Sequence, residues 1–305
     1  MANAIINSTG NIYYSKMRTT ASSSSLVVTD LLTATSATST AEKTYTASGT
    51  SNTCTAHTTV KSESSPEVGV NATRFFIVTN NVMCGYQLTT TAAMTLASHH
   101  AITFYISAKT AIPASSLQLL VCTDTAGVTP VETINLPAIA AGGWDTTNNV
   151  PDTDTVWYRV VLRLNNPSSD TSLDSIAFKT TTAFTGDYFA IYQVRALAEM
   201  PGRTNFSISE SLDEIDVSDY QSRYSREFAD SFSAWTLSID GHKEGAPPFD
   251  LRSVYTIGIA ETDTVGQAFV GDAFYTGFTP AGTFSDKVSY PYSCRGVGFL
   301  YKPTA

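Results

Sequence analysis

Two stretches, Ala101-Ile-Thr-Phe-Tyr-Ile-Ser107 and Trp157-Tyr-Arg-Val-Val-Leu-Arg-Leu164, decide the fold of this chain. In the first, large apolar side chains occupy every second position, at Ile102, Phe104 and Ile106. Successive side chains of a strand point to opposite faces of the sheet, so this period of two predicts strands with one buried face.

Further runs of the same kind follow between residues 70 and 197. Residues 117–121 alternate as well, and residues 188–197 form a last run rich in aromatic and apolar side chains. Turn residues separate these runs, as at Asp124-Thr-Ala-Gly127 and Asn165-Asn-Pro167. Several short strands divided by turns at this spacing predict a β-sandwich.

The order of these runs adds a resemblance to the sandwich prediction. The phrases ITFYIS, LQLLV, ETINLPAIAAGGWD, WYRVVLRL, LDSIAFK and GDYFAIYQVRAL follow one another in residues 102–197. Their order resembles that of the galactose-binding-type jelly rolls, the fold of many carbohydrate-binding modules. In that family a strand with an Asp-Ile-Arg-like phrase closes the domain, and Tyr192-Gln-Val-Arg195 stands in that place.

The C-terminal third, residues 198–305, has a different pattern. Ala234-Trp-Thr-Leu-Ser-Ile-Asp240 predicts a strand with Trp235, Leu237 and Ile239 on one face. Asp250 is a good helix N-cap, so we expect a short helix beginning at Leu251. In the closing residues 287–301 the apolar positions change from even to odd numbers, which predicts a β-bulge near Gly296.

Several phrases of this third resemble the tail tube proteins of long-tailed phages. They are Asp213-Glu-Ile-Asp-Val-Ser218, Arg226-Glu-Phe228, Trp235-Thr-Leu-Ser-Ile-Asp-Gly241, Gly271-Asp-Ala-Phe-Tyr-Thr-Gly277 and Arg295-Gly-Val-Gly298. The resemblance implies a small β-sandwich flanked by a helix, with a long hairpin loop. It also implies that six copies form a ring and that rings stack into a conduit for DNA.

We therefore expect an all-β chain of four parts: a tail-tube-type β-sandwich with one short helix, plus an inserted jelly-roll sandwich. Residues 1–40 are an arm with strands that complete the tube domain, and residues 41–69 are a Ser/Thr-rich linker. Residues 70–197 form the jelly roll, and residues 198–305 form the tube domain. An insertion of this kind is physically easy, because chain termini often lie close together and insertions occur at surface loops.

The amino-acid composition argues against several classes of function. Charged residues make up 15% of the chain, and the net charge is −9. Residues 198–305 hold 15 acidic and 8 basic side chains, a net charge of −7, against −2 for residues 1–197. Such a chain lacks the clustered Lys and Arg that grip nucleic acid. The N-terminus has no secretory signal pattern and no run is apolar enough to span a membrane, so we expect assembly in a host cytoplasm.

Motifs that carry chemistry are missing from the sequence. There is no Gly-x-Ser-x-Gly elbow, phosphate loop or zinc-protease motif, so we expect no enzyme, no catalytic residue, no metal and no cofactor. The acid pair Asp152 and Asp154 could serve a glycosidase or bind calcium, but such residues more often lie in solvated loops. The widely spaced Cys54, Cys84, Cys122 and Cys294 are expected to be free thiols.

Trp144 and Trp157 carry two interpretations. An indole can stack on a sugar, which would make both residues glycan contacts of the jelly roll. The alternative is that Trp157 lies in a core strand and Trp144 packs under a loop, because large aromatic side chains dominate the cores of sandwiches.

The function expected from these observations is structural. The chain would be the major tail tube subunit of a phage, located in the virion tail, and its partners would be copies of itself and other tail proteins. Double-stranded DNA would pass without specific binding, repelled by lumen-facing Asp213, Glu214, Asp216 and Asp219. The jelly roll would face outward, toward cell-surface glycans. The alternative is a phage receptor-binding or adhesin-like carbohydrate-binding protein.

Overall fold

A computed structural model of the chain describes most of the second half of the sequence and separate strands of the first. The described residues are 11–16, 30–32, 43–47, 53–58, 71–77, 83–87, 95–124, 127–147, 151, 155–181, 187–216, 228–242, 249, 253–260, 268–278, 280 and 288–302.

The described chain is an all-β structure, as the alternating sequence predicts, and one short 3-10 turn, η1 (Pro167–Ser169), is its single helical segment. The strands are β1 (Asn11–Lys16), β2 (Asp30–Leu32), β3 (Lys43–Ala47), β4 (Thr53–Thr58), β5 (Asn71–Ile77), β6 (Met83–Gln87), β7 (Ala101–Ala108), β8 (Leu117–Cys122), β9 (Pro130–Asn135), β10 (Tyr158–Arg163), β11 (Ser175–Thr180), β12 (Asp187–Glu199), β13 (Arg203–Asp216), β14 (Phe228–Gly241), β15 (Val254–Ala260), β16 (Ala268–Phe278) and β17 (Tyr292–Tyr301).

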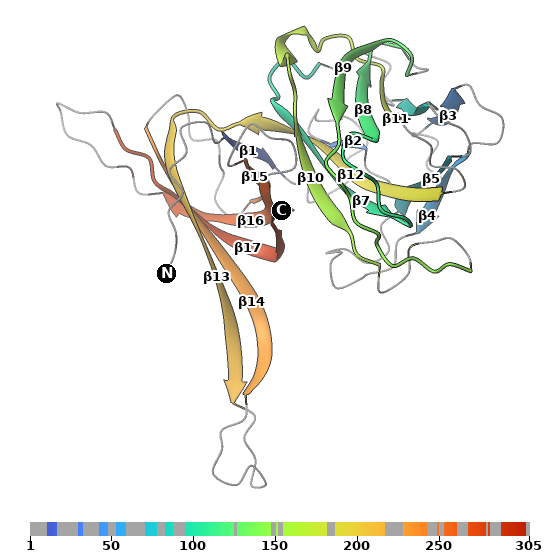
Figure 1. Cartoon of the computed structure of the whole chain (residues 1–305). Helices are drawn as coiled ribbons and strands as arrows, with labels where there is room; N and C mark the ends of the chain where they lie inside the picture. The colour runs from blue at the N-terminus through green and yellow to red at the C-terminus, as the bar shows by residue number, and fades with distance from the viewer. Residues whose placement is uncertain are drawn as a thin grey trace, which may run out of the picture.

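These strands form two antiparallel sheets. The larger one has the order β10-β7-β12-β1-β15-β16-β17-β14-β13, with β2 and β5 also pairing with β12, and β4 with β5. The smaller one has the order β3-β6-β11-β8-β9. We call β2 to β12 the jelly-roll unit, and β1 with β13 to β17 the C-terminal unit; Figure 1 shows them side by side.

The two sheets of the jelly-roll unit enclose an apolar core. Phe178 of β11 packs edge-on between Phe104 of β7 and Phe189 of β12, with ring centroids 5.6 Å and 6.3 Å away. All three rings are buried. This is the face that the alternating sequence predicts, since Ile102 and Ile106 lie in the same core.

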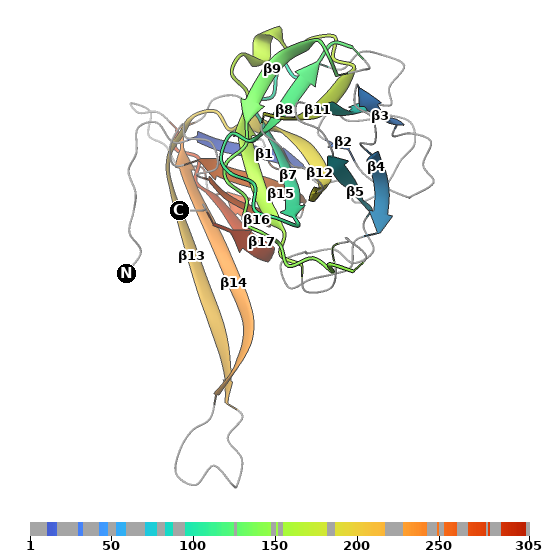
Figure 2. The same ribbon diagram turned by 45° about the vertical axis from the view of Figure 1, so that its right-hand side comes forward.

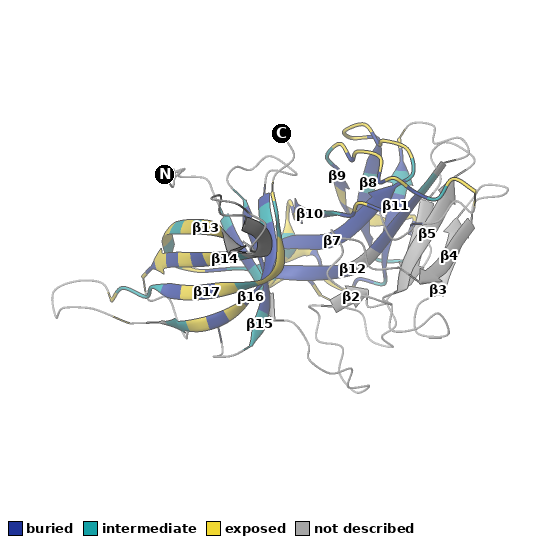
Figure 3. Cartoon of the chain, turned by 90° about the horizontal axis from the view of Figure 1, so that it is seen from below, coloured by how far each residue is buried: buried dark blue, intermediate teal, exposed yellow. Residues whose placement is uncertain are grey.

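In the C-terminal unit, Trp235, Leu237 and Ile239 of β14 are buried, as expected, while the residues between them are exposed. The unit's long strands β13 and β14 run away from the rest of the molecule as a hairpin (Figures 1 and 2). Figure 3 shows alternating buried and exposed residues along β14 and β17, and continuous burial along β7 and β12.

Glycines make room for Trp235. A methyl group on Gly296 would lie 2.2 Å from the indole, and one on Gly271 would lie 2.5 Å from it. The indole nitrogen donates a hydrogen bond of 3.1 Å to the carbonyl of Gly298, which has a φ of 70°. The register of β16 and β17 shifts between Val297 and Tyr301, so the predicted bulge is present but is centred beyond Gly296.

Two sequence-based expectations need correction. A helix from Leu251 is wrong from Val254 onward, because Val254–Ala260 is β15; Leu251 itself lies outside the described residues. This segment is rich in β-branched and aromatic residues, whose preference for strands outweighs one N-cap signal. The proposed linker 41–69 contains β3 and β4, which pair with β6 and β5. Threonine-rich sequence forms strands readily, so composition alone was a poor guide.

We predict that Gly296→Ala destabilises the protein by about 1–3 kcal/mol, because the new methyl group overpacks the site of Trp235. Gly277→Ala on the neighbouring strand β16 is the matched control, since its methyl group meets no atom within 4 Å. Urea unfolding of both variants measures the effect. Equal stability of the two variants would show that Trp235 does not need this glycine.

Candidate functional site

The two units share one continuous sheet. The end of β12 pairs with β1 at Ala198 and Glu199, and β1 pairs along its whole length with β15. Where β15 faces the jelly-roll unit, Gly258 allows close approach: a methyl group there would lie 3.2 Å from Val161 and 3.4 Å from Leu197. The division into an inserted and a host domain remains a prediction, since these strands connect both units.

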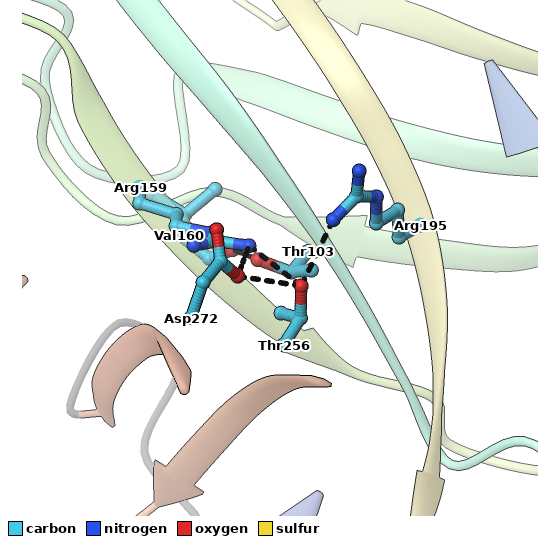
Figure 4. Close-up of polar contacts among 6 residues, drawn as sticks. All are labelled: Thr103, Arg159, Val160, Arg195, Thr256 and Asp272. Carbon is cyan, nitrogen blue, oxygen red and sulfur yellow. Dashed lines mark hydrogen bonds and ion pairs between the residues drawn. The ribbon is translucent and has the colours of Figure 1, made fainter. Parts of the chain in front are cut away.

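A buried polar cluster lies between the units (Figure 4). Arg159 of β10 donates hydrogen bonds of 3.0 Å to the carboxylate of Asp272 on β16 and to the hydroxyl of Thr256 on β15. Arg195 of β12 also donates to the Thr256 hydroxyl, at 3.0 Å. Thr256 in turn donates to Asp272 at 2.7 Å, so the cluster links both arginines to one carboxylate.

Arg159 is held from a second side by aromatic rings. Its guanidinium lies 4.7 Å from the centre of the Tyr105 ring, and Tyr105 packs edge-on against Tyr301 of β17. Burial by itself would lower the pKa of Arg159, but the charge of Asp272 and the hydrogen bond to it outweigh burial, so the pKa of Arg159 lies above its ordinary value. Arg159 is therefore charged, and its ion pair with Asp272 joins two residues that lie 113 positions apart in the sequence.

The sequence did not reveal this cluster. The alternation of apolar and polar residues predicts that one face of β7 and β10 is exposed to solvent. The polar residues on that face are nevertheless buried: Thr103, Ser107 and Arg159. The sequence offers one sign of buried polar residues, which is the presence of arginine and threonine in strands that are otherwise strongly apolar. This sign does not indicate which residues they would contact.

The acidic segment predicted from the sequence lies at the far end of the hairpin. Asp213, Glu214 and Asp216 belong to the last part of β13, and Asp219 lies outside the described residues. Glu214 is paired in register with Asp230 of β14. Whether these carboxylates face a lumen depends on an assembly of several copies, so that part stays a prediction.

This end of the hairpin has no neighbouring strand in the described structure. β14 pairs with β17 from Thr236 to Ile239, and β13 is the last strand of the sheet. We call the part beyond this pairing the ribbon: residues 211–216 of β13 and 228–234 of β14. An isolated two-stranded ribbon is marginally stable in water, and free strand edges are templates for pairing with another chain.

The two candidate sugar-binding tryptophans are buried. Trp144 is 6% exposed, and its indole nitrogen donates a hydrogen bond of 2.8 Å to Ser107. Trp157 is 1% exposed and packs in the same aromatic cluster as Tyr105. Neither ring offers an open face to a sugar in this structure.

The other candidate residues from the sequence are two aspartates and the cysteines. Asp152 and Asp154 lie outside the described residues. Cys122 and Cys294 are buried free thiols, as predicted, and burial raises the pKa of each to about 12.

Within the described ranges, no group of three His, Cys, Asp or Glu side chains could hold a metal ion. The same ranges contain no helix that could cross a membrane.

Asp170 is an unusual buried acid in the jelly-roll unit. Its residue is fully buried, and neither carboxylate oxygen has a hydrogen-bond partner in the described part of the chain. Burial, with the nearby charge of Glu132, raises the pKa of Asp170 to about 6. Glu132 itself accepts hydrogen bonds from the backbone of Asn165 and Asn166, which fixes the loop that leads to Asp170.

No protein-family model and no curated protein matches this chain. Solved structures that resemble parts of this chain do so only weakly. A family 11 carbohydrate-binding module of the cellulase Lic26A-Cel5E of Clostridium thermocellum is 14% identical, with 57% of this chain and 96% of that chain covered and a TM-score of 0.35. The K2 cleaved adhesin domain of Lys-gingipain is 14% identical, with 51% and 88% covered and a TM-score of 0.33. The tail of an empty GTA particle with C6 symmetry is 19% identical, with 36% and 87% covered and a TM-score of 0.29. Likeness this weak assigns no function.

The inter-unit ion pair leads to a prediction. Asp272→Leu should cost about 3–5 kcal/mol, because it leaves the charge of Arg159 buried and unpaired. The double variant Arg159→Met/Asp272→Leu should recover part of that loss, since an apolar pair of similar volume removes the buried charge of Arg159 and leaves only that of Arg195. Urea unfolding of the single and double variants measures both values. A double variant as unstable as Asp272→Leu alone would contradict the assignment.

Asp170 leads to a prediction about pH. Its pKa is raised in the folded state, so the folded protein binds this proton more tightly, and the stabilising effect is lost as the pH rises through about 6. Relative to Asp170→Asn, the wild type should lose roughly 2–3 kcal/mol of stability between pH 4 and pH 7. Asp174→Asn, at a partly exposed site in the same loop, is the control. A difference that does not change with pH would show that Asp170 ionises normally.

Proposed function

We propose that this chain is a structural virion protein, the major tail tube subunit of a long-tailed phage, and that copies of it form stacked rings around a DNA conduit. The ribbon is the observation that carries this proposal. In the described part of the chain, no strand pairs with either edge of the ribbon, and such a segment becomes stable when a second chain covers it.

The sequence resemblance supports the same assignment. The phrases that resemble tail tube proteins fall on the hairpin and on the sheet from which it extends: Trp235–Gly241 lies in β14, Gly271–Gly277 in β16 and Arg295–Gly298 in β17. Gly271 and Gly296, one from each of the last two phrases, form the slot for Trp235. These phrases therefore build the part of the molecule from which the ribbon extends.

The jelly-roll unit would decorate the outside of the tube. The buried cluster around Arg159 and Asp272 fixes it to the tube sheet, so the decoration would be rigid. The acidic C-terminal third suits a conduit, because a wall with a net charge of −7 per copy repels phosphates instead of gripping them. Carbohydrate binding was the alternative function, but the burial of Trp144 and Trp157 leaves it without support from either ring.

Self-assembly is the test of this function. The purified full-length protein should form tubes or rings of uniform diameter as its concentration rises, as seen by negative-stain electron microscopy. A variant in which residues 213–232 are replaced by a two-residue Asn-Gly turn between the paired residues Leu212 and Ser233 should keep its fold and stay monomeric, because it retains the β14–β17 pairing and lacks most of the ribbon. A full-length protein that stays monomeric at all concentrations, and is no major component of a virion tail, would refute the proposal.

A further inference from the structure

One corner of the jelly-roll unit lies where three chain segments meet. They are residues 95–96 ahead of β7, the strand β9, and residues 165–173 between β10 and β11, which we call the corner loop. Backbone hydrogen bonds converge on Asp170 there. Its carbonyl accepts a hydrogen bond of 2.7 Å from the N–H of Leu96, and its own N–H donates to the carbonyl of Pro167 at 3.1 Å. Asp170 therefore ties the corner loop to the segment ahead of β7.

The corner loop is also anchored to the core and to β9. Three leucines at this corner are buried members of the jelly-roll core: Leu96, Leu164 and Leu173. Glu132 of β9 holds the start of the loop, because its carboxylate accepts hydrogen bonds of 3.1 Å and 2.6 Å from the backbone N–H groups of Asn165 and Asn166. Displacement of the loop would break these hydrogen bonds and expose apolar surface to water.

One backbone conformation in the corner loop is unusual for its residue. Ser172 has a φ of 58°, in the left-handed region that residues with a side chain seldom adopt. Such a conformation persists only while the surrounding contacts hold it. Asp170 lies two positions before Ser172, so the closed loop depends on the contacts that Asp170 makes.

The carboxyl group of Asp170 opposes the closed loop when it is ionised. The residue is fully buried, neither of its carboxylate oxygens has a hydrogen-bond partner in the described structure, and the charge of Glu132 acts on it. The other titratable side chains on the segments around this corner are His99, His100, Arg163 and Asp174. None of them donates a hydrogen bond to Asp170 in the described structure. A buried carboxylate without a donor is costly, and a neutral carboxyl group is much less so.

We propose that Asp170 makes the corner loop a pH-sensitive latch, closed while the carboxyl group of Asp170 is protonated and opening when that group ionises. Opening lets the carboxylate reach water and releases the left-handed backbone of Ser172, and it exposes the leucines beneath the loop. This inference does not depend on the tube function, because every group in it belongs to the jelly-roll unit.

The direction of the pH effect follows from the two states of the loop. In the closed loop the pKa of Asp170 is raised from 3.8 to about 6, first by burial and then by Glu132. In the open loop the carboxyl group is solvated, so its pKa is close to the ordinary value. The closed loop therefore has its full stability below about pH 4 and loses stability as the pH rises to about 6. A difference of about two pKa units changes the equilibrium between the closed and open loop roughly 100-fold.

Hydrogen–deuterium exchange of the dilute full-length protein between pH 4 and pH 7 tests the latch. The results are expressed as protection factors, which correct for the effect of pH on intrinsic exchange. The backbone amides of Leu96, Asn165 and Asn166 donate hydrogen bonds in the closed loop and report on its opening. Their protection should fall about tenfold per pH unit between pH 4 and pH 6 and level off above. Amides in the middle of β7 and β12 should keep their protection throughout and serve as the internal control.

Two variants assign the effect to one carboxyl group. Asp170→Asn has a similar volume and cannot ionise, so protection of its corner loop should not change with pH. Asp174→Asn, at a partly exposed position just after the loop, should behave like the wild type. The same fall of protection in Asp170→Asn would show that another group opens the loop and would overturn the inference. Constant protection of the corner loop in the wild type from pH 4 to pH 7 would overturn it without any variant, because Asp170 would then ionise in the closed loop.

Discussion

The buried ion pair between Arg159 and Asp272 is the constraint on which the arrangement of the chain depends. An unpaired charge at this depth is expensive, so the pair forms only when both units are in place. Thr256 extends the pair to Arg195, and Gly258 lets the apolar surfaces meet beside it. The jelly-roll unit and the C-terminal unit are therefore parts of one body, joined by a shared sheet, a polar cluster and an apolar contact.

The ribbon stands in contrast to this closed body. Most strands of the described structure have neighbouring strands on both sides. Residues 211–216 and 228–234 have their own hairpin pairing and no other in the described structure. Interactions within one chain thus account for the body but not for the ribbon, and this difference is why we assign the ribbon to an assembly contact.

Much of the fold followed from the sequence, because alternation of apolar residues reports directly on one buried face. That rule located the faces of β7 and of β14, with Trp235, Leu237 and Ile239 inside. It failed where a second unit covers the opposite face: Thr103 and Arg159 resemble solvent-facing residues, and their partners lie far away in the sequence.

Hydrogen–deuterium exchange of the full-length protein at increasing concentration tests the central claim most directly, which is that the ribbon is completed by a second copy. Amides of residues 211–216 and 228–234 should exchange rapidly in dilute protein, because a two-stranded ribbon opens easily, and should become protected as the concentration rises. Amides of β7 and β12 should be protected throughout. Ribbon amides that exchange at the same rate at every concentration, including concentrations at which the protein is assembled, would contradict the account.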